Sequence, residues 1–122
     1  MTGVETGFLP RYFAALDEGE DIMPMLARDF SFALLWSSAG EAHEFAGGFD
    51  AWAGYMSQRE PDGQRHHISH LLREGNTELA TGWTTRFDEP LGTFTFAVEL
   101  DGHGLVRRLF AARTEAFSGT PF

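Results

Sequence analysis

Apolar residues near the start of the chain recur at helical spacing. Four of them repeat every three or four residues, and they are Phe8, Tyr12, Phe13 and Leu16. This pattern predicts an amphipathic helix, with Pro10 in its first turn and Gly19 at its end. A short second helix is predicted over residues 23–27, with Asp21 as its candidate cap.

Strand-like alternation follows the helical stretch. One face of the first predicted strand carries Phe30, Phe32, Leu34 and Trp36. Residues 41–46 suggest a return strand, and apolar residues from Phe49 to Met56 predict another helix. The second half predicts strands over residues 64–74, 78–87, 92–100 and 105–117. Hairpin-linked strands preceded by helices predict one α+β domain over residues 1–122, with a loose tail from about residue 118.

The composition limits the cellular environment and the classes of partner that we expect for this chain. The chain has 122 residues, no cysteine and a net charge of −9. Disulfides and cysteine-bound metals are therefore excluded, and the acidic surface disfavours nucleic acid. No apolar run approaches the roughly 20 residues of a membrane span, and the N-terminal residues lack the features of a signal peptide. We expect a cytoplasmic protein with neither a membrane nor a nucleic acid as partner.

Four segments in this order resemble the nuclear-transport-factor-two-like superfamily. They are residues 11–21, 26–32, 47–52, and the stretch from Arg65-His66 into the three-strand meander. The superfamily includes SnoaL-like cyclases, ketosteroid isomerases and scytalone dehydratase. The resemblance implies a cystatin-like cone, in which helices pack on a strongly curved antiparallel sheet with a mixed edge and leave an internal pocket. It also implies a homodimer formed through the convex sheet face, with Leu71, Thr84, Thr95 and Ala97 expected there.

The resemblance also suggests roles for individual residues. Tyr12 stands where ketosteroid isomerases keep an oxyanion-hole tyrosine, but their general base and acid would fall at Leu34 and Phe96, which cannot transfer protons. Scytalone dehydratase-like proteins use an acid matched by Asp17 and a histidine matched by His66. Their main catalytic histidine would fall near Trp83. The match is therefore partial.

We select eight candidate site residues. His66 is the expected acid or base, Tyr12 a hydrogen-bond donor and Asp17 an orienting partner. The expected ligand-binding residues are Trp36, His70, Trp83, Phe96 and Arg113. Strand alternation would place His66, Ile68, His70 and Leu72 together on one face, and the resemblance implies that this is the inner face. His66 and His70 would then lie roughly 13 Å apart at about 3.3 Å per residue, too far to share a metal ion.

Two functions remain open at this point. In the first, the chain binds a small, mostly apolar or aromatic molecule and transforms it by acid/base chemistry without a cofactor or metal, through dehydration, isomerisation or cyclisation. The alternative is a non-catalytic carrier or dimeric scaffold. Each polar candidate also has a structural interpretation, since His66 could be a satisfied core histidine, Asp17 a solvated acid and Arg113 a partner in a surface ion pair.

Overall fold

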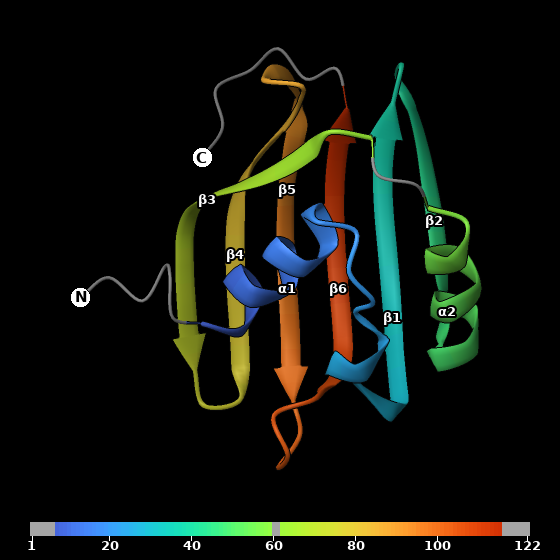
Figure 1. The fold of residues 1–122 in the computed structure, drawn as a ribbon, viewed down its shortest axis with the longest axis vertical. Coiled ribbons are helices and arrows are strands. Elements are labelled where there is room, and N and C mark those ends of the chain that lie inside the picture. Colours follow the sequence, from blue (N-terminus) through green and yellow to red (C-terminus); the bar gives the residue numbers. More distant parts are fainter. Residues whose placement is uncertain (1–6, 60–61, 116–122) are drawn as a thin grey trace.

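Two helices lie on one face of a six-stranded sheet in the computed structural model, which describes residues 7–59 and 62–115 (Figure 1). Helix α1 spans Phe8–Asp17, a 3-10 turn η1 spans Met23–Met25, and helix α2 spans Phe49–Ser57. The strands are β1 (Leu26–Ser38), β2 (Glu41–Gly48), β3 (Gln64–Glu74), β4 (Thr77–Arg86), β5 (Glu89–Leu100) and β6 (Val106–Glu115). The predicted α+β architecture is confirmed.

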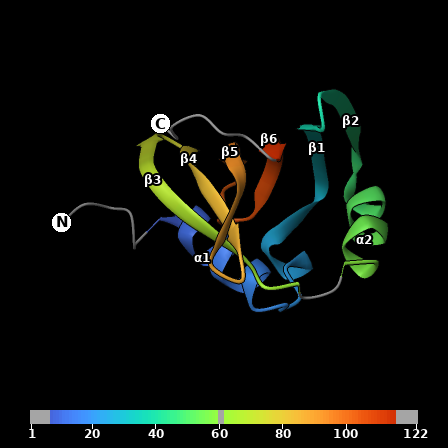
Figure 2. The same ribbon diagram turned by 90° about the horizontal axis from the view of Figure 1, so that it is seen from above.

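The strand order β2-β1-β6-β5-β4-β3 makes the sheet mixed. All neighbouring pairs are antiparallel except β1 and β6, which run parallel. Figure 2 shows the sheet curling around α1, with β3 crossing over the end of that helix. Helix α1 contacts β3 and β4, whereas α2 contacts β1 and β2 at the other edge. The prediction that the first helix packs across the concave face is therefore confirmed.

The concave face holds an aromatic core. Phe30, Phe32 and Leu34 of β1 are buried, and so are Phe94 and Phe96 of β5. Both sets follow the predicted alternation, because every second side chain of a strand points to the same face. Helix α1 buries Phe8, Leu9, Tyr12 and Phe13 against them. Removing this apolar surface from water is the main force that holds the helix on the sheet.

The predicted second helix is shorter than expected. Only Met23–Met25 forms a 3-10 turn, and Leu26 already begins β1 by pairing with Val106 of β6. Asp21 does act at its start, because its Oδ1 accepts a hydrogen bond of 3.0 Å from the Met23 N–H. Sheet pairing and burial of Leu26 and Ala27 prevail over the local helical pattern.

A β-bulge in β3 changes which residues face the core. The register shifts between Ile68 and His70, so Ser69 is an extra residue that no residue of β4 opposes. His66 and Ile68 face inward as predicted, but after the bulge it is Leu71 that packs against the core. His70 pairs with Thr81 and is exposed, as is Leu72. The predicted inward positions of His70 and Leu72, and the outward position of Leu71, are therefore wrong.

The positions of Trp83 and Thr84 are also the reverse of those predicted. Thr84 pairs with His66 and is 1% exposed, so it belongs to the inner face. Trp83 pairs with His67, stacks on its ring with centroids 5.1 Å apart, and is 37% exposed on the outer face. His66 and Trp83 therefore lie on opposite faces, so the prediction of one concave pocket bounded by both is wrong. A one-residue error in strand alignment is enough to exchange the two faces.

Candidate active site

Asp17 and His66 form a hydrogen-bonded pair at the end of α1. Helix α1 ends at Asp17, and the first part of β3 crosses this end and brings His66 against it (Figure 1). Asp17 Oδ1 lies 2.7 Å from His66 Nδ1, and Oδ2 accepts the His66 backbone N–H at 2.8 Å. The side chains are 9% and 1% exposed. These two hydrogen bonds offset the unfavourable field that a carboxylate meets at a helix C-terminus.

The surroundings of His66 determine how many protons its ring carries and on which nitrogen. Burial lowers the pKa of His66 below its ordinary 6.5, and this effect outweighs the nearby Asp17, which raises it. The ring is therefore neutral at pH 7. Since an ionised carboxylate only accepts hydrogen bonds, the single ring proton of His66 lies on Nδ1. Nε2 then presents its lone pair, and this buried atom has no hydrogen-bond partner.

Aromatic rings hold the imidazole in place. Phe13 of α1 stacks on His66 with centroids 4.6 Å apart and planes 5° from parallel. Phe94 meets the same ring edge-on at 5.3 Å. Phe96 lies on the inner face as predicted, 6.4 Å from His66 and 6.5 Å from Tyr12. The imidazole therefore faces an apolar interior that contains few competing polar groups.

Tyr12 is fully buried in this interior. Burial raises the pKa of its phenol well above the ordinary 10.0, so the hydroxyl keeps its proton. The Trp52 indole faces it and partly opposes that rise, but neither the Tyr12 hydroxyl nor Trp52 Nε1 has a hydrogen-bond partner of good geometry. Tyr12 therefore holds a buried hydroxyl donor that has no acceptor among the described residues.

Arg113 lies farther along the concave face, near the end of β6. It pairs with Phe94 on β5 and Trp36 on β1. Its Nη2 donates a 2.9 Å hydrogen bond to Gln64 Oε1, whereas its buried Nε has no acceptor. A cavity of about 90 Å³ adjoins it, lined by Leu34, Trp36, Tyr55, Arg113 and Glu115. Trp36 and Arg113 thus line one cavity, and Arg113 is partly buried and takes part in no ion pair among the described residues.

The structure brings some of the predicted site residues together. Asp17 and His66 touch, and the positive charge of Arg113 is close enough to His66 to lower its pKa. A further cavity of about 80 Å³ lies beside Asp17 and Gln64. Both cavities are far smaller than the roughly 300–1,000 Å³ of typical ligand pockets. The enclosed space beside these residues is thus smaller than the expected aromatic or terpenoid-sized pocket.

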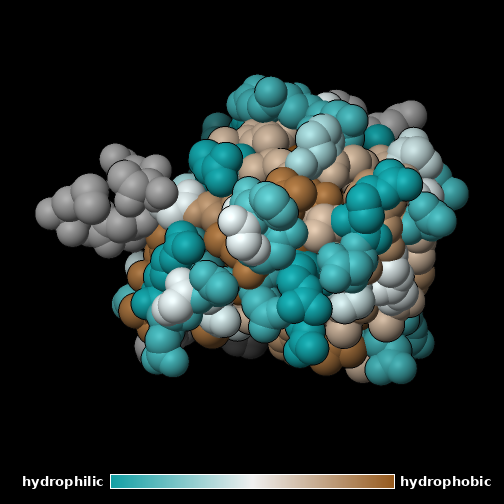
Figure 3. All heavy atoms as spheres, turned by 90° about the horizontal axis from the view of Figure 1, so that it is seen from below, coloured by the Kyte–Doolittle hydropathy of each residue, from teal (hydrophilic) through white to brown (hydrophobic). Residues whose placement is uncertain are grey.

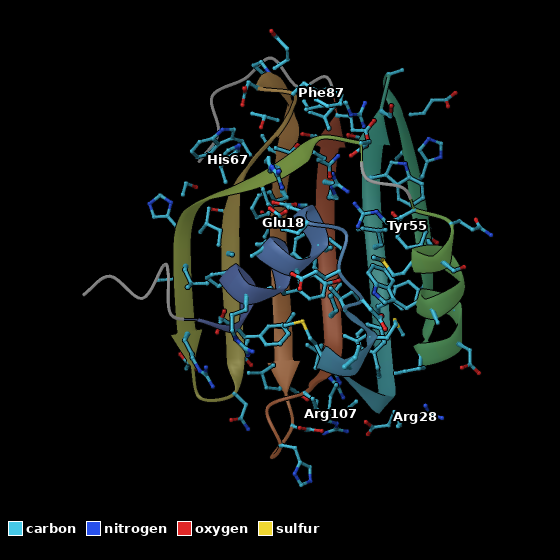
Figure 4. The ribbon with its side chains drawn as sticks, in the orientation of Figure 1. Glu18, Arg28, Tyr55, His67, Phe87 and Arg107 are labelled. Carbon is cyan, nitrogen blue, oxygen red and sulfur yellow. The ribbon has the colours of Figure 1, made fainter. Side chains whose placement is uncertain are left out.

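Sequence reasoning missed two site residues. Gln64 shares the inner face with His66 because it lies two positions before it along β3, so the alternation of that strand could have revealed it. Tyr55 had no such signal, because its position depends on how α2 packs against β1. Figure 4 shows Tyr55 on the side of α2 that faces the sheet, and Glu18 at the end of α1 below β3.

Comparison with known proteins supports the fold. No family model and no curated protein matches the chain. Similar solved structures include a candidate ketosteroid isomerase from Kribbella flavida, with 22% identity, a TM-score of 0.63, and coverage of 93% of this chain and 80% of that one. A candidate isomerase of the SnoaL-like family from Agrobacterium tumefaciens has 16% identity, a TM-score of 0.60 and coverage of 84% and 90%.

A third similar structure is described by its fold. It is an uncharacterised protein with a cystatin-like fold from Silicibacter pomeroyi, with 15% identity, a TM-score of 0.57, and coverage of 89% of this chain and 77% of that one. At these identities the likeness concerns the fold alone. The chain therefore has the cystatin-like architecture shared by ketosteroid isomerase-like and SnoaL-like structures, and the resemblance seen in the sequence is confirmed at that level.

Two further observations concern only residues 7–59 and 62–115. Neither helix in these ranges is long and apolar enough to cross a lipid bilayer. The same ranges contain no group of three or more acidic, histidine or cysteine side chains placed to hold a metal ion. His66 and His70, the one histidine pair with a metal-like spacing in the sequence, point to opposite faces of β3.

Proposed function

We propose that this protein binds a small, mostly apolar organic molecule at the Asp17–His66 end of the concave face and transforms it by acid/base chemistry that uses its own side chains. The observation that carries the proposal is the pair itself. Asp17 holds the Nδ1 proton of His66, and the opposite ring nitrogen is buried, unprotonated and unpaired. This arrangement suits a general base more than a structural histidine, whose polar atoms would both be satisfied.

The proposed step is a proton transfer at carbon. His66 Nε2 takes the proton of an activated C–H bond, and the electron pair of that bond moves into the adjacent unsaturated group of the substrate. The resulting imidazolium is stabilised by the Asp17 carboxylate, and the Tyr12 hydroxyl donates to oxygen that gains negative charge. The proton then returns to another atom or assists departure of a leaving group, as isomerisation, cyclisation and dehydration require.

A neutral probe can test the base before the natural substrate is known. 5-Nitrobenzisoxazole loses the proton on its C–H carbon to a base while its N–O bond breaks, which yields a nitrile and a coloured nitrophenolate. We expect the protein to accelerate this reaction well above an equal concentration of free imidazole, because Nε2 is desolvated and oriented. Acceleration no greater than that of imidazole would contradict the proposal.

The lowered pKa of His66 predicts a particular pH dependence. As pH falls below 6.5, the unfolded chain protonates this histidine first, while the folded protein keeps it neutral until the lower folded pKa is reached. The free energy of unfolding should therefore decrease through this window relative to His66→Gln, which lacks the titrating group. Probe turnover should stay constant above pH 6.5 and fall only below it. Denaturant unfolding and kcat/KM measured at each pH check both expectations.

The carrier function remains the second candidate, and a specific observation favours it. Leu34 and Phe96 are buried hydrocarbons at the two positions where ketosteroid isomerases keep their proton-transferring groups. Trp83, where the main histidine of scytalone dehydratase-like proteins was expected, lies on the outer face. A carrier would bind the benzisoxazole probe without accelerating its ring opening.

We also propose a homodimer through the outer face of the sheet. This face exposes four large apolar side chains, Leu35, Leu79, Trp83 and Phe110, each 37–43% exposed. Thr95 and Ala97 join them, because they alternate with buried Phe94 and Phe96. Open grooves of about 490 and 530 Å³ run across the same sheet, and side chains of a second copy could fit into them. A two-fold axis would let the same surface serve both copies.

Light scattering tests the dimer. The chain has a mass of 13.6 kDa, so a dimer requires about 27 kDa at micromolar concentration. Phe110→Asp should shift the mass toward the monomer, because it places a charge at the centre of an apolar contact. Replacement of an exposed residue at the opposite end, such as His103→Asp in the β5–β6 turn, should leave the mass unchanged. A wild-type mass near 13.6 kDa would refute the dimer.

A further inference from the structure

Arg113 differs from several arginines on the surface of this protein. Arg65, Arg86 and Arg107 are about half exposed, and each lies 2.9–3.5 Å from a carboxylate of Glu18, Asp62 or Asp29. Figure 3 shows the end of the molecule that carries the β5–β6 turn, and hydrophilic residues cover much of it. These three arginines thus have acidic partners, although water alone would satisfy them. Arg11 and Arg28 are also exposed, and their guanidinium groups lie over the rings of Phe8 and Phe49 instead.

Arg113 is partly buried, its Nε is fully enclosed, and it has no such ion pair within residues 7–59 and 62–115. In the described parts of the chain, no carboxylate lies within 4.0 Å of the Arg113 guanidinium. Glu115 lines the same cavity, but its carboxylate is directed toward the Ser38 hydroxyl, 3.5 Å away. Asp17 is engaged by His66. Burial lowers the pKa of Arg113, and this effect outweighs the charges of Glu115 and Asp62, which favour the cation. A partly buried cation with no carboxylate in direct contact is costly, and proteins normally pair or neutralise such charges. The chain has a net charge of −9, yet no described carboxylate is placed against Arg113, and we therefore look for an anionic ligand as its partner.

The donors around the cavity match a small anion. The buried Nε–H of Arg113 has no acceptor, and Gln64 Oε1 holds one terminal nitrogen of the guanidinium so that its plane is fixed. Trp36, Leu34 and Tyr55 supply apolar and aromatic walls. The volume of about 90 Å³ equals roughly three waters at about 30 Å³ each, enough for a carboxylate with a few carbons. Planar carboxylates fit the guanidinium fork better than other anions of this size.

We infer that the molecule bound at this site carries a carboxylate, which pairs with Arg113 in the cavity beside Trp36. The inference rests on the proposed function for the position of the reacting carbon. Phe94 connects the two groups, because its ring meets His66 at 5.3 Å and its backbone pairs with Arg113. An acid bound at Arg113 would therefore extend its apolar part toward His66 Nε2. The ligand class is an apolar carboxylic acid with an activated C–H bond a few atoms from the carboxylate.

Isobutyrate and isobutyramide are a matched pair of probes, since they differ in charge and hardly in size. We expect isobutyrate to bind about 10–100-fold more tightly than the amide, as charge-assisted hydrogen bonds allow. NMR titration supplies the affinities, and a shift of the Arg113 Nε–H signal with isobutyrate locates the binding. Arg113→Gln should remove the preference for the acid. Arg108→Gln, an exposed change on the same strand, should leave it intact.

A second variant guards against misfolding of Arg113→Gln. Gln64→Glu keeps the side-chain shape but places a carboxylate on the guanidinium, so isobutyrate binding should weaken at least tenfold. Equal affinity for acid and amide, or isobutyrate binding that survives in Gln64→Glu, would overturn the inference. The neutral benzisoxazole probe reports on His66 separately. Failure of that reaction with intact isobutyrate binding would reject the proposed catalysis alone.

Discussion

Replacing His66 with glutamine should lower kcat/KM for 5-nitrobenzisoxazole by about 10²–10⁴-fold. Glutamine preserves approximate size and can still hydrogen-bond to Asp17, but its amide has no nitrogen that accepts a proton near neutral pH. Asp17→Asn should cause a loss of similar order. An amide donor at Nδ1 would move the ring proton of His66 to Nε2 and so remove the basic lone pair.

The adjacent histidine is a suitable control for this experiment. His67 lies on the outer face, where it stacks on Trp83 and contacts the Thr85 hydroxyl at 2.8 Å. His67→Gln should therefore change turnover less than twofold. Circular dichroism and thermal melting would establish that each variant is folded. Unchanged turnover in folded His66→Gln would exclude His66 as the base and leave the carrier function as the better interpretation.

Replacing Glu78 with leucine should lower the free energy of unfolding by about 3–5 kcal/mol. Glu78 of β4 is only 1% exposed, and its carboxylate accepts the backbone N–H groups of Phe8 at 3.0 Å and Leu9 at 2.6 Å. These are the first donors of α1, which no earlier helical turn can satisfy. Leucine fills the space but leaves both N–H groups buried and unpaired, and it also removes the partner of Arg73 at 3.6 Å.

Denaturant unfolding measures this loss, and two further variants identify its cause. Glu78→Gln keeps one acceptor oxygen, so it should cost less than Glu78→Leu. Glu99→Leu changes a more exposed glutamate whose ion pairs are at the surface, and it should cost under about 1 kcal/mol. If Glu78→Leu were as stable as Glu99→Leu, the carboxylate would not be what anchors α1 to the sheet.

The sequence alone determined the architecture of this protein and part of its site. Alternation in β1 and β5 revealed which side chains face the core, because period-two burial is a local property of a strand. The amphipathic pattern of α1 and the order of the segments were enough to predict a helix on a curved sheet. The resemblance also singled out Asp17 and His66, although either His66 or Arg113 could have been the partner of Asp17 until the structure placed them.

Only the tertiary structure decided which side chains of β3 and β4 face the core and which contacts the charged groups of the interior make. The bulge at Ser69 gives no clear local signal, yet it turns His70 outward and Leu71 inward. The anchoring of α1 by Glu78 joins residues 70 positions apart, and Gln64 meets Arg113 across 49. The balance that lowers the pKa of His66 likewise depends on burial, which only the assembled core supplies. Such long-range contacts arise from packing, so no local pattern of residue types encodes them.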